Sequence, residues 1–138
     1  MKINREAVKN KFNGLCAYTG KPLGEDWQVD HAIPKCHSIW HKSIEDRKQY
    51  GVEYDCDDVQ NLLPAIKIVN HYKRGESIHS FKITMSTFHK RLARLPKKTS
   101  KDKTLKRIKY MRTIAELFDI TESKPFSGLF YFETLLNT

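Results

Sequence analysis

The sequence contains little cysteine and no long apolar run. Its three cysteines are Cys16, Cys36 and Cys56. An odd number of cysteines in a chain without a secretion signal favours reduced thiols over a disulfide framework. No apolar run approaches the length that spans a bilayer, and the first residues lack the apolar segment of a signal peptide. We therefore expect no membrane association and a cytoplasmic location.

Internal repeats and low-complexity linkers are also absent. Hydrophobic residues make up 39% of the chain and charged residues 30%, a balance typical of folded rather than disordered proteins. A length of 138 residues suits one domain with a modest core, or a small core with an appendage. We expect a single compact domain overall.

Acidic residues are scarce in one part of the chain. Residues 76–112 hold 12 Lys or Arg against 2 Asp or Glu, whereas residues 1–75 hold 12 against 10 and residues 113–138 hold 1 against 4. Essentially the whole excess behind the net charge of +9 therefore lies in one block. Such a block indicates a polyanion binder, most often of nucleic acid, and the alternative is a solvated, lysine-rich helix face.

The expected elements mix helices with short strands, which predicts an α+β fold. Asn4 is a plausible N-cap for a short first helix, and a hairpin-like segment follows it. Periodicity and turn residues predict strands over residues 27–31 and 59–65, a short helix near 43–50 and a helix over 65–74 that Gly75 ends. Two basic helices are expected over 77–95 and 103–119, and residues 128–135 are expected to form a closing strand.

An acid and an imidazole, Asp30 and His31, stand together at the end of the first predicted strand. If the second strand returns beside the first, Asn61 lies across from His31, and Asn70 on the next helix can point toward Asp30. Carboxylate and amide oxygens are ligands that Mg²⁺ and Mn²⁺ prefer. A neutral imidazole can take a proton from an attacking water. Lys73, with help from Arg74, can pair with a phosphate.

The motifs of residues 12–75 resemble those of the HNH endonucleases, which have the ββα-metal, or His-Me finger, fold. Members usually show Asp-His-Ile-x-Pro, and residues 30–34 read DHAIP. They also show an Asn-Leu that opens the second strand, here residues 61–62, and nine residues later an Asn-x-x-Lys, here residues 70–73. The combination of motifs is specific, although each of them alone is not.

The resemblance implies a role for each matching residue. It makes His31 the general base, and it assigns Asn61 to positioning the histidine loop. Asp30 and Asn70 would hold a single divalent ion, with Mg²⁺ expected and Mn²⁺ or Ni²⁺ as alternatives. Some family members use histidine as the last ligand, so His71 is an alternative to Asn70.

The chain departs from the family at the structural zinc site. Many relatives carry two Cys-x-x-Cys pairs, but here the first pair reads Cys16 and Thr19, and the second falls on Ile66 and Val69. A closed zinc site needs the three missing thiolates, so we expect no structural zinc and apolar packing in its place. The alternative is a replacement site built from Cys36, His37, His41 and Cys56.

Together these features predict an HNH nuclease core over residues 1–75 and a basic helical extension over residues 76–138 that packs on it. We expect a metal-dependent endonuclease that hydrolyses phosphodiester bonds in DNA, with duplex DNA as its partner. The alternative is a non-catalytic nucleic-acid-binding module on the same scaffold. The oligomeric state stays open. Phosphates away from the cleaved bond are expected to contact Lys90, Arg91, Arg94, Lys97 and Lys98.

Overall fold

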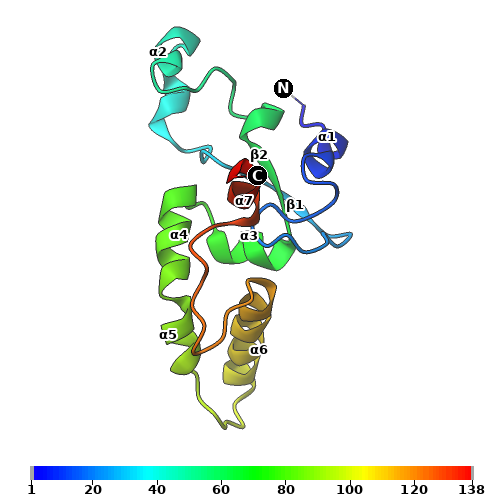
Figure 1. Ribbon diagram of the computed structural model, residues 1–138, viewed down its shortest axis with the longest axis vertical. Coiled ribbons are helices and arrows are strands. Elements are labelled where there is room, and N and C mark those ends of the chain that lie inside the picture. Colours follow the sequence, from blue (N-terminus) through cyan, green and yellow to red (C-terminus); the bar gives the residue numbers. More distant parts are fainter. Residues whose placement is uncertain (1, 138) are drawn as a thin grey trace. The chain divides into compact units, whose positions relative to one another are not determined.

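The computed structural model describes residues 2–137 (Figure 1). Contacts between residues divide the chain into two compact units, Met1–Ile78 and His79–Thr138, where the sequence predicts a core and an extension that meet at residues 75 and 76. Within the described residues, seven α-helices accompany one antiparallel sheet of two strands. The expected α+β class is therefore confirmed.

The first helix, α1 (Arg5–Asn10), begins as the sequence predicts. The side chain of Asn4 accepts a hydrogen bond from the backbone N–H of Ala7 at 3.1 Å, which satisfies a donor that has no partner inside the helix. The hairpin-like segment that follows contains a single bridge, between Leu15 and Pro22. It is therefore a loop closed at one point.

The sheet pairs β1 (Gln28–His31) with β2 (Leu62–Ala65). The strands run antiparallel, and the register places His31 opposite Leu62 and Asp30 opposite Leu63. All four residues of β2 are buried. The sheet thus holds the end of β1 against the core of the first unit.

The second strand begins three residues later than predicted, because Val59–Asn61 form a 3-10 turn, η2. The side chain of Asp58 accepts a hydrogen bond from the backbone N–H of Gln60 at 2.9 Å. A local side-chain bond of this kind favours a turn over extended backbone. Asn61 therefore precedes the strand, and its carbonyl accepts a hydrogen bond from the N–H of Ala32 at 2.8 Å.

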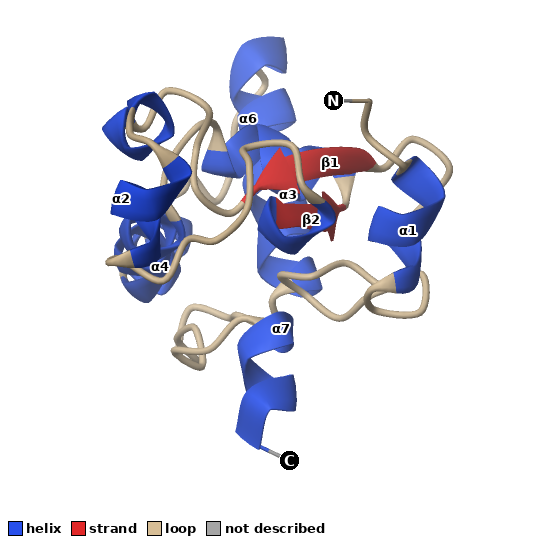
Figure 2. Cartoon of the chain, turned by 90° about the horizontal axis from the view of Figure 1, so that it is seen from above, coloured by secondary structure: helices blue, strands red, loops and turns tan. Residues whose placement is uncertain are grey.

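Helix α3 (Lys67–Lys73) follows β2 directly and packs against β1 (Figure 2). Val69 is its fully buried apolar residue. The helix ends at Lys73 and is capped by Arg74, one residue before the predicted cap at Gly75, and Arg74 has a φ of 59°. A positive φ is costly for a residue with a side chain, so the end of α3 is a strained position.

The connection between the two strands is ordered around one buried arginine. It contains η1 (Ser38–His41) and α2 (Ile44–Lys48), the latter inside the predicted helix at 43–50. Arg47 is 6% exposed, donates to the carbonyl of Lys42 at 2.9 Å and pairs with Asp55 at 2.9 Å. These bonds, together with the buried side chains of Ile39 and Val52, give this largely polar segment a fixed shape.

The second unit contains α5 (Phe88–Ala93), α6 (Asp102–Leu117) and all but the first residue of α4 (Ile78–Ser86). The sequence predicts one helix over residues 77–95, but the chain breaks it at Thr87. The hydroxyl groups of Ser86 and Thr87 donate to carbonyls one turn earlier, and such bonds compete with the helical pattern. Helix α6 lies inside the predicted span of 103–119, apart from its first residue.

The closing strand predicted over residues 128–135 is wrong. This segment forms α7 (Tyr131–Thr134), followed by η3 (Leu135–Asn137). The carboxylate of Glu133 accepts a hydrogen bond from the backbone N–H of Phe130 at 2.9 Å, which caps the helix. Phe130 is fully buried and stacks on Phe81 with 5.2 Å between ring centroids, so the aromatic residues form the core of the second unit.

Candidate functional site

The acid of the predicted pair, Asp30, is buried between a phenol and an ammonium group. The hydroxyl of Tyr18 donates to its Oδ2 atom, and Lys73 Nζ lies 3.0 Å from the same oxygen. Lys73 is 1% exposed and also donates to the carbonyl of Glu76 at 2.5 Å. A buried carboxylate needs partners of this kind, and both of them act on one oxygen.

Burial raises the pKa of Tyr18 well above its ordinary value, and the neighbouring charge and hydrogen bond of Asp30 raise it further. Tyr18 therefore keeps its proton at neutral pH and remains a donor to Asp30. The phenol and the lysine together hold the Asp30 side chain in one orientation.

The imidazole of the predicted pair, His31, contacts a second carboxylate. Its Nε2 atom lies 2.8 Å from Asp57 Oδ1. The hydrogen bond from His31 lowers the pKa of Asp57 below its ordinary value, burial opposes the shift, and the charges of His31 and Lys35 add to it. An ionised carboxylate can only accept, so Nε2 carries the proton in this pair. In the neutral ring, Nδ1 is then the nitrogen that can accept a proton.

The Asn61 side chain links the loop that follows His31 to the loop that contains Cys56 and Asp57. Its side-chain oxygen accepts from the backbone N–H of Ile33 at 2.8 Å, and its nitrogen donates to the carbonyls of Ile33 at 3.2 Å and Cys56 at 2.8 Å. Asn61 is fully buried, and its three bonds reach partly buried backbone groups. The structure thus brings the Asn61 amide to the loop that begins at His31.

Asn70 lies on the same face of β1 as Asp30 but contacts a different residue. Its amide nitrogen donates to Gln28 Oε1 at 2.8 Å, one turn of α3 before Lys73. Asp30 therefore faces Lys73, and Asn70 faces the residue two positions earlier on the strand. His71, the alternative ligand, is exposed.

A cavity of about 270 Å³ opens beside the predicted pair. Carboxylate, imidazole and ammonium groups from β1 and α3 meet in its wall, and Asn70 does not line it. The lining residues are Asp30, His31, Pro34, Lys35, Cys36, Lys73 and Gly75. These residue types are suited to binding a phosphate and moving a proton, so we place the candidate site here.

Two features of this site were not predicted from the sequence. Tyr18 and Asp57 contact Asp30 and His31 directly, although they lie 12 and 26 residues away along the chain. The signal for Asp57 was the acidic end of the long connection, EYDCDD. Burial raises the pKa of the Cys56 thiol in the same segment, and the charge of Asp57 adds to this while Lys35 opposes it.

The structure shows where the residues of the two zinc arrangements considered from the sequence lie. Cys16 and Val69, two of the four positions that the resemblance compares with zinc ligands, are fully buried, and Tyr18 is almost fully buried. His37 Nδ1 accepts from the backbone N–H of Ile39 at 3.0 Å, so that nitrogen has a structural partner. Within residues 2–137, the structure does not gather Cys36, His37, His41 and Cys56 into one group.

The predicted phosphate-binding residues differ in how they are held. Arg74 is exposed. In the second unit, Arg91 donates to Thr87 Oγ1 and to the carbonyl of Thr84, both at 2.8 Å, and Lys97 pairs with Glu122 at 2.8 Å. Lys90, Arg94 and Lys98 are exposed. Beyond the predicted residues, α6 and its N-cap carry further exposed basic side chains: Lys101, Lys103, Lys106, Arg107, Lys109 and Arg112.

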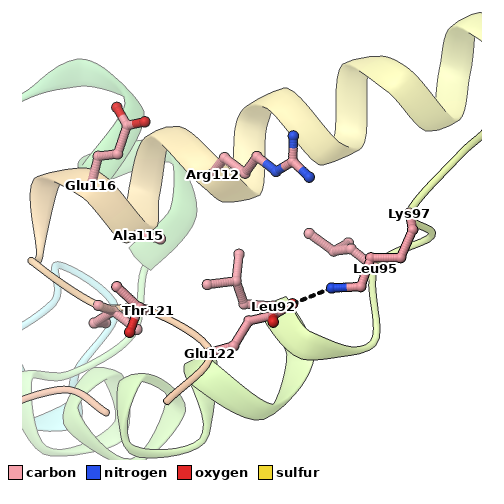
Figure 3. Close-up of a pocket in the computed structure, with 9 residues that line it drawn as sticks. Leu92, Leu95, Lys97, Arg112, Ala115, Glu116, Thr121 and Glu122 are labelled. Carbon is pink, nitrogen blue, oxygen red and sulfur yellow. Dashed lines mark hydrogen bonds and ion pairs between the residues drawn. The ribbon is translucent and has the colours of Figure 1, made fainter. Parts of the chain in front are cut away.

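A larger cavity of about 360 Å³ lies within the second unit (Figure 3). Its wall contains the aliphatic side chains of Leu92, Leu95 and Ala115, and its rim carries the Lys97–Glu122 ion pair. Size alone would favour this cavity. It lacks the adjoining imidazole and carboxylate of the smaller one, so we do not assign the chemistry to it.

Within the described residues, no helix has both the length and the hydropathy to cross a membrane. No family model, curated protein or solved structure matches the chain.

Proposed function

We propose that the chain is an HNH-type endonuclease that hydrolyses phosphodiester bonds in DNA with the help of a divalent metal ion. The observation that supports this most is the meeting of Asp30, His31 and Lys73 at one cavity. The elements β1, β2 and α3 follow one another in the order expected of a ββα-metal core. The fully buried Asn61 holds the histidine loop by three hydrogen bonds.

His31 is the proposed general base. With Nε2–H held by Asp57, the Nδ1 lone pair can accept a proton from the attacking water. Asp57 then stabilises the imidazolium that forms, because an opposite charge lies 2.8 Å away. Asp57 is a positioning residue in this scheme, since it acts through His31.

The residues fit a hard divalent ion such as Mg²⁺, with Mn²⁺ or Ni²⁺ as alternatives. Asp30 would hold it through Oδ1, because its donor bonds use Oδ2 alone, and the amide oxygen of Asn70 would join it once the Asn70 side chain turns away from Gln28. A bound ion would stabilise negative charge on the phosphate and the leaving oxygen. In the structure Lys73 compensates the charge of Asp30, and at the cavity wall it can also pair with a phosphate.

The substrate we propose is duplex DNA, and the cytoplasm is the proposed compartment. The exposed lysines and arginines of the second unit supply the charge that phosphate binding needs. All three cysteines are free, which suits a reducing compartment.

Plasmid cleavage tests the proposal. We expect the wild-type chain to relax or linearise supercoiled plasmid with Mg²⁺, and EDTA to stop the reaction. His31→Ala should lower the rate by at least about a hundredfold, the contribution of a positioned base. His37→Ala is the matched control, because His37 is an exposed histidine that caps η1.

Intact supercoiled plasmid with Mg²⁺, Mn²⁺ and Ni²⁺ alike would rule out the nuclease. Tight duplex binding in the same samples would then favour the non-catalytic binding module.

A further inference from the structure

Three side chains able to bind a metal gather beside the histidine loop. One ligand atom from each of His31, Cys56 and Asp57 lies within 4.8 Å of the other two. Within the described residues, no other group of three or more His, Cys, Asp or Glu side chains approaches this closely. We propose that these residues form a second metal site, one that binds zinc and is distinct from the oxygen ligands Asp30 and Asn70.

The ligand types select the metal. Imidazole, thiolate and carboxylate are the ligands that hold Zn²⁺ in proteins, and three of them leave a fourth position for water. Mg²⁺ prefers oxygen and binds thiolates poorly. One histidine, one cysteine and one aspartate therefore favour zinc over the Mg²⁺ that the proposed nuclease reaction uses.

The distances fit a tetrahedral ion after small side-chain rotations. Zinc–ligand bonds of about 2.0–2.3 Å place neighbouring ligand atoms roughly 3.3–3.7 Å apart. His31 Nε2 and Asp57 Oδ1 now lie 2.8 Å apart, joined by a hydrogen bond that zinc coordination would replace. The Cys56 thiol loses its proton to solvent on binding, as coordinated cysteines do.

The backbone that carries these ligands is already fixed. The buried Asn61 amide donates to the carbonyl of Cys56 at 2.8 Å and bonds both backbone groups of Ile33. The two loops are thus held together before any ion arrives, so little ordering is needed on binding. Because Asn61 fixes the backbone of both loops, the group differs from three side chains that meet by chance on a mobile surface.

An ion can reach the group without unfolding the chain. The side chain of His31 is 13% exposed and that of Asp57 is 32% exposed. His31 also lines the cavity of the candidate site. A zinc ion would therefore bind at the edge of this cavity, where it meets the proposed base.

The consequence of binding rests on the proposed function. A neutral imidazole that coordinates a metal through one nitrogen carries its proton on the other, so no lone pair is left to take a proton from water. Zinc at this site would therefore inhibit the Mg²⁺-dependent reaction by occupying His31. The site would make the nuclease sensitive to free zinc.

Cobalt spectroscopy tests the site without any assay of activity. We expect metal-free wild-type protein to bind one Co²⁺ with a thiolate-to-cobalt absorption band, and Zn²⁺ to remove the band by displacement. Cys56→Ser should abolish the band, and Asp57→Asn should weaken zinc binding more than about tenfold in competition with a chromophoric chelator. Cys36→Ser is the matched control, because Cys36 is an exposed cysteine that lines the candidate-site cavity beside His31 but lies outside the group of three ligands.

Several results would overturn the site. They are a wild-type spectrum without the thiolate band, a band that survives in Cys56→Ser, or a band lost equally in Cys36→Ser. Circular dichroism of each variant shows whether it is folded, and Asp57→Asn gives an independent reading if Cys56→Ser does not fold.

Plasmid cleavage separates this inference from the proposed function. In each variant, the rate with Mg²⁺ plus zinc is divided by its own rate with Mg²⁺ alone. Zinc should depress this ratio in the wild type and Cys36→Ser, and much less in Cys56→Ser. Zinc that binds without inhibiting would refute the inhibition. Plasmid left uncut under all conditions would refute the nuclease, while the cobalt spectrum would still decide the zinc site.

Discussion

At the scale of single residues, the candidate site is organised by two groups of bonded side chains. Tyr18 and Lys73 hold Asp30 from inside the core, and Asp57 holds His31 from the loop side. The first group is almost completely buried, whereas the second is partly open to solvent. Asp30 and His31 thus each have a partner that sets their orientation before a substrate binds.

Tyr18→Phe should lower the free energy of unfolding at pH 7 by about 1–3 kcal/mol, because it removes a buried hydrogen bond to a carboxylate. Urea unfolding measures the change. Tyr50→Phe is the control, since Tyr50 is 65% exposed, and it should leave the unfolding free energy within about 0.5 kcal/mol of wild type. An unchanged value for Tyr18→Phe would show that the hydroxyl does not support Asp30.

The same phenol predicts an alkaline pH dependence. The pKa of Tyr18 is raised in the folded chain, so its contribution to stability is complete below the unfolded-state pKa of about 10 and is lost as pH rises through the folded-state pKa. Unfolding free energy should therefore fall more steeply above pH 10 in the wild type than in Tyr18→Phe. Parallel curves for the two proteins would contradict the assignment.

The residues of the site differ in how far the sequence could predict them. Asp30, His31 and Asn61 stood in recognisable spacing, and the structure brings them close together. Tyr18 and Asp57 could not be predicted, because their contacts depend on how loops fold back over 12 and 26 residues. Spacing placed Asn70 near Asp30, but the register of α3 on β1 instead matched it with Gln28.

At the scale of elements, local polar bonds explain the predictions that were wrong. Hydrophobic periodicity predicted the position of most helices and of β1 well. It did not predict the turn at η2, where Asp58 bonds the backbone, or the helix break at Thr87. The apolar closing segment alternates like a strand, yet Glu133 caps it as a helix. Side chains that bond their own backbone are weak signals in a hydrophobic pattern.

The hydrogen bonds by which Asn61 joins two loops can be tested directly. Asn61→Asp keeps an acceptor for Ile33 N–H but replaces the amide donor with a charged oxygen facing two carbonyls. Burying an unpaired charge there should lower the free energy of unfolding by about 3 kcal/mol or more. Hydrogen exchange should also show reduced protection of the backbone amides at residues 32–34.

The matched control for this substitution is Asn13→Asp. Asn13 is exposed and has a φ of 54°, a conformation that aspartate tolerates, so the same chemical change should shift stability by less than about 0.5 kcal/mol. Equal effects of the two substitutions would mean that the Asn61 bonds do not hold the loops together.

At the scale of the whole molecule, the candidate site and most of the exposed basic residues lie in different units. The first unit contains the candidate site and the sheet, while the second has an aromatic core and most of the basic surface. Composition alone predicted that the basic block would bind a polyanion. It could not predict which basic side chains would make contacts within the protein. The structure shows Lys97 in an ion pair and Arg91 hydrogen-bonded to α4.

The exposed face of α6 should therefore dominate non-specific DNA binding. Each phosphate contact contributes about 0.9 to the slope of log affinity against log salt. Alanine at Lys103, Lys106, Arg107 and Lys109 should lower that slope by up to about 3.6 if all four contact phosphate. The measurement is fluorescence anisotropy of a labelled duplex across a salt series, with EDTA present so that the DNA stays intact.

A second fourfold variant separates position from total charge. The first unit has exposed lysines at Lys9, Lys42, Lys48 and Lys67. Their replacement by alanine removes the same number of positive charges as the α6 variant. If phosphates bind α6 specifically, the slope of this control stays close to wild type while the α6 variant loses most of its salt dependence. Equal losses would mean that DNA responds to net charge alone. In that case the basic block would attract DNA without a defined binding face, and the candidate site would have to orient the duplex by its own contacts.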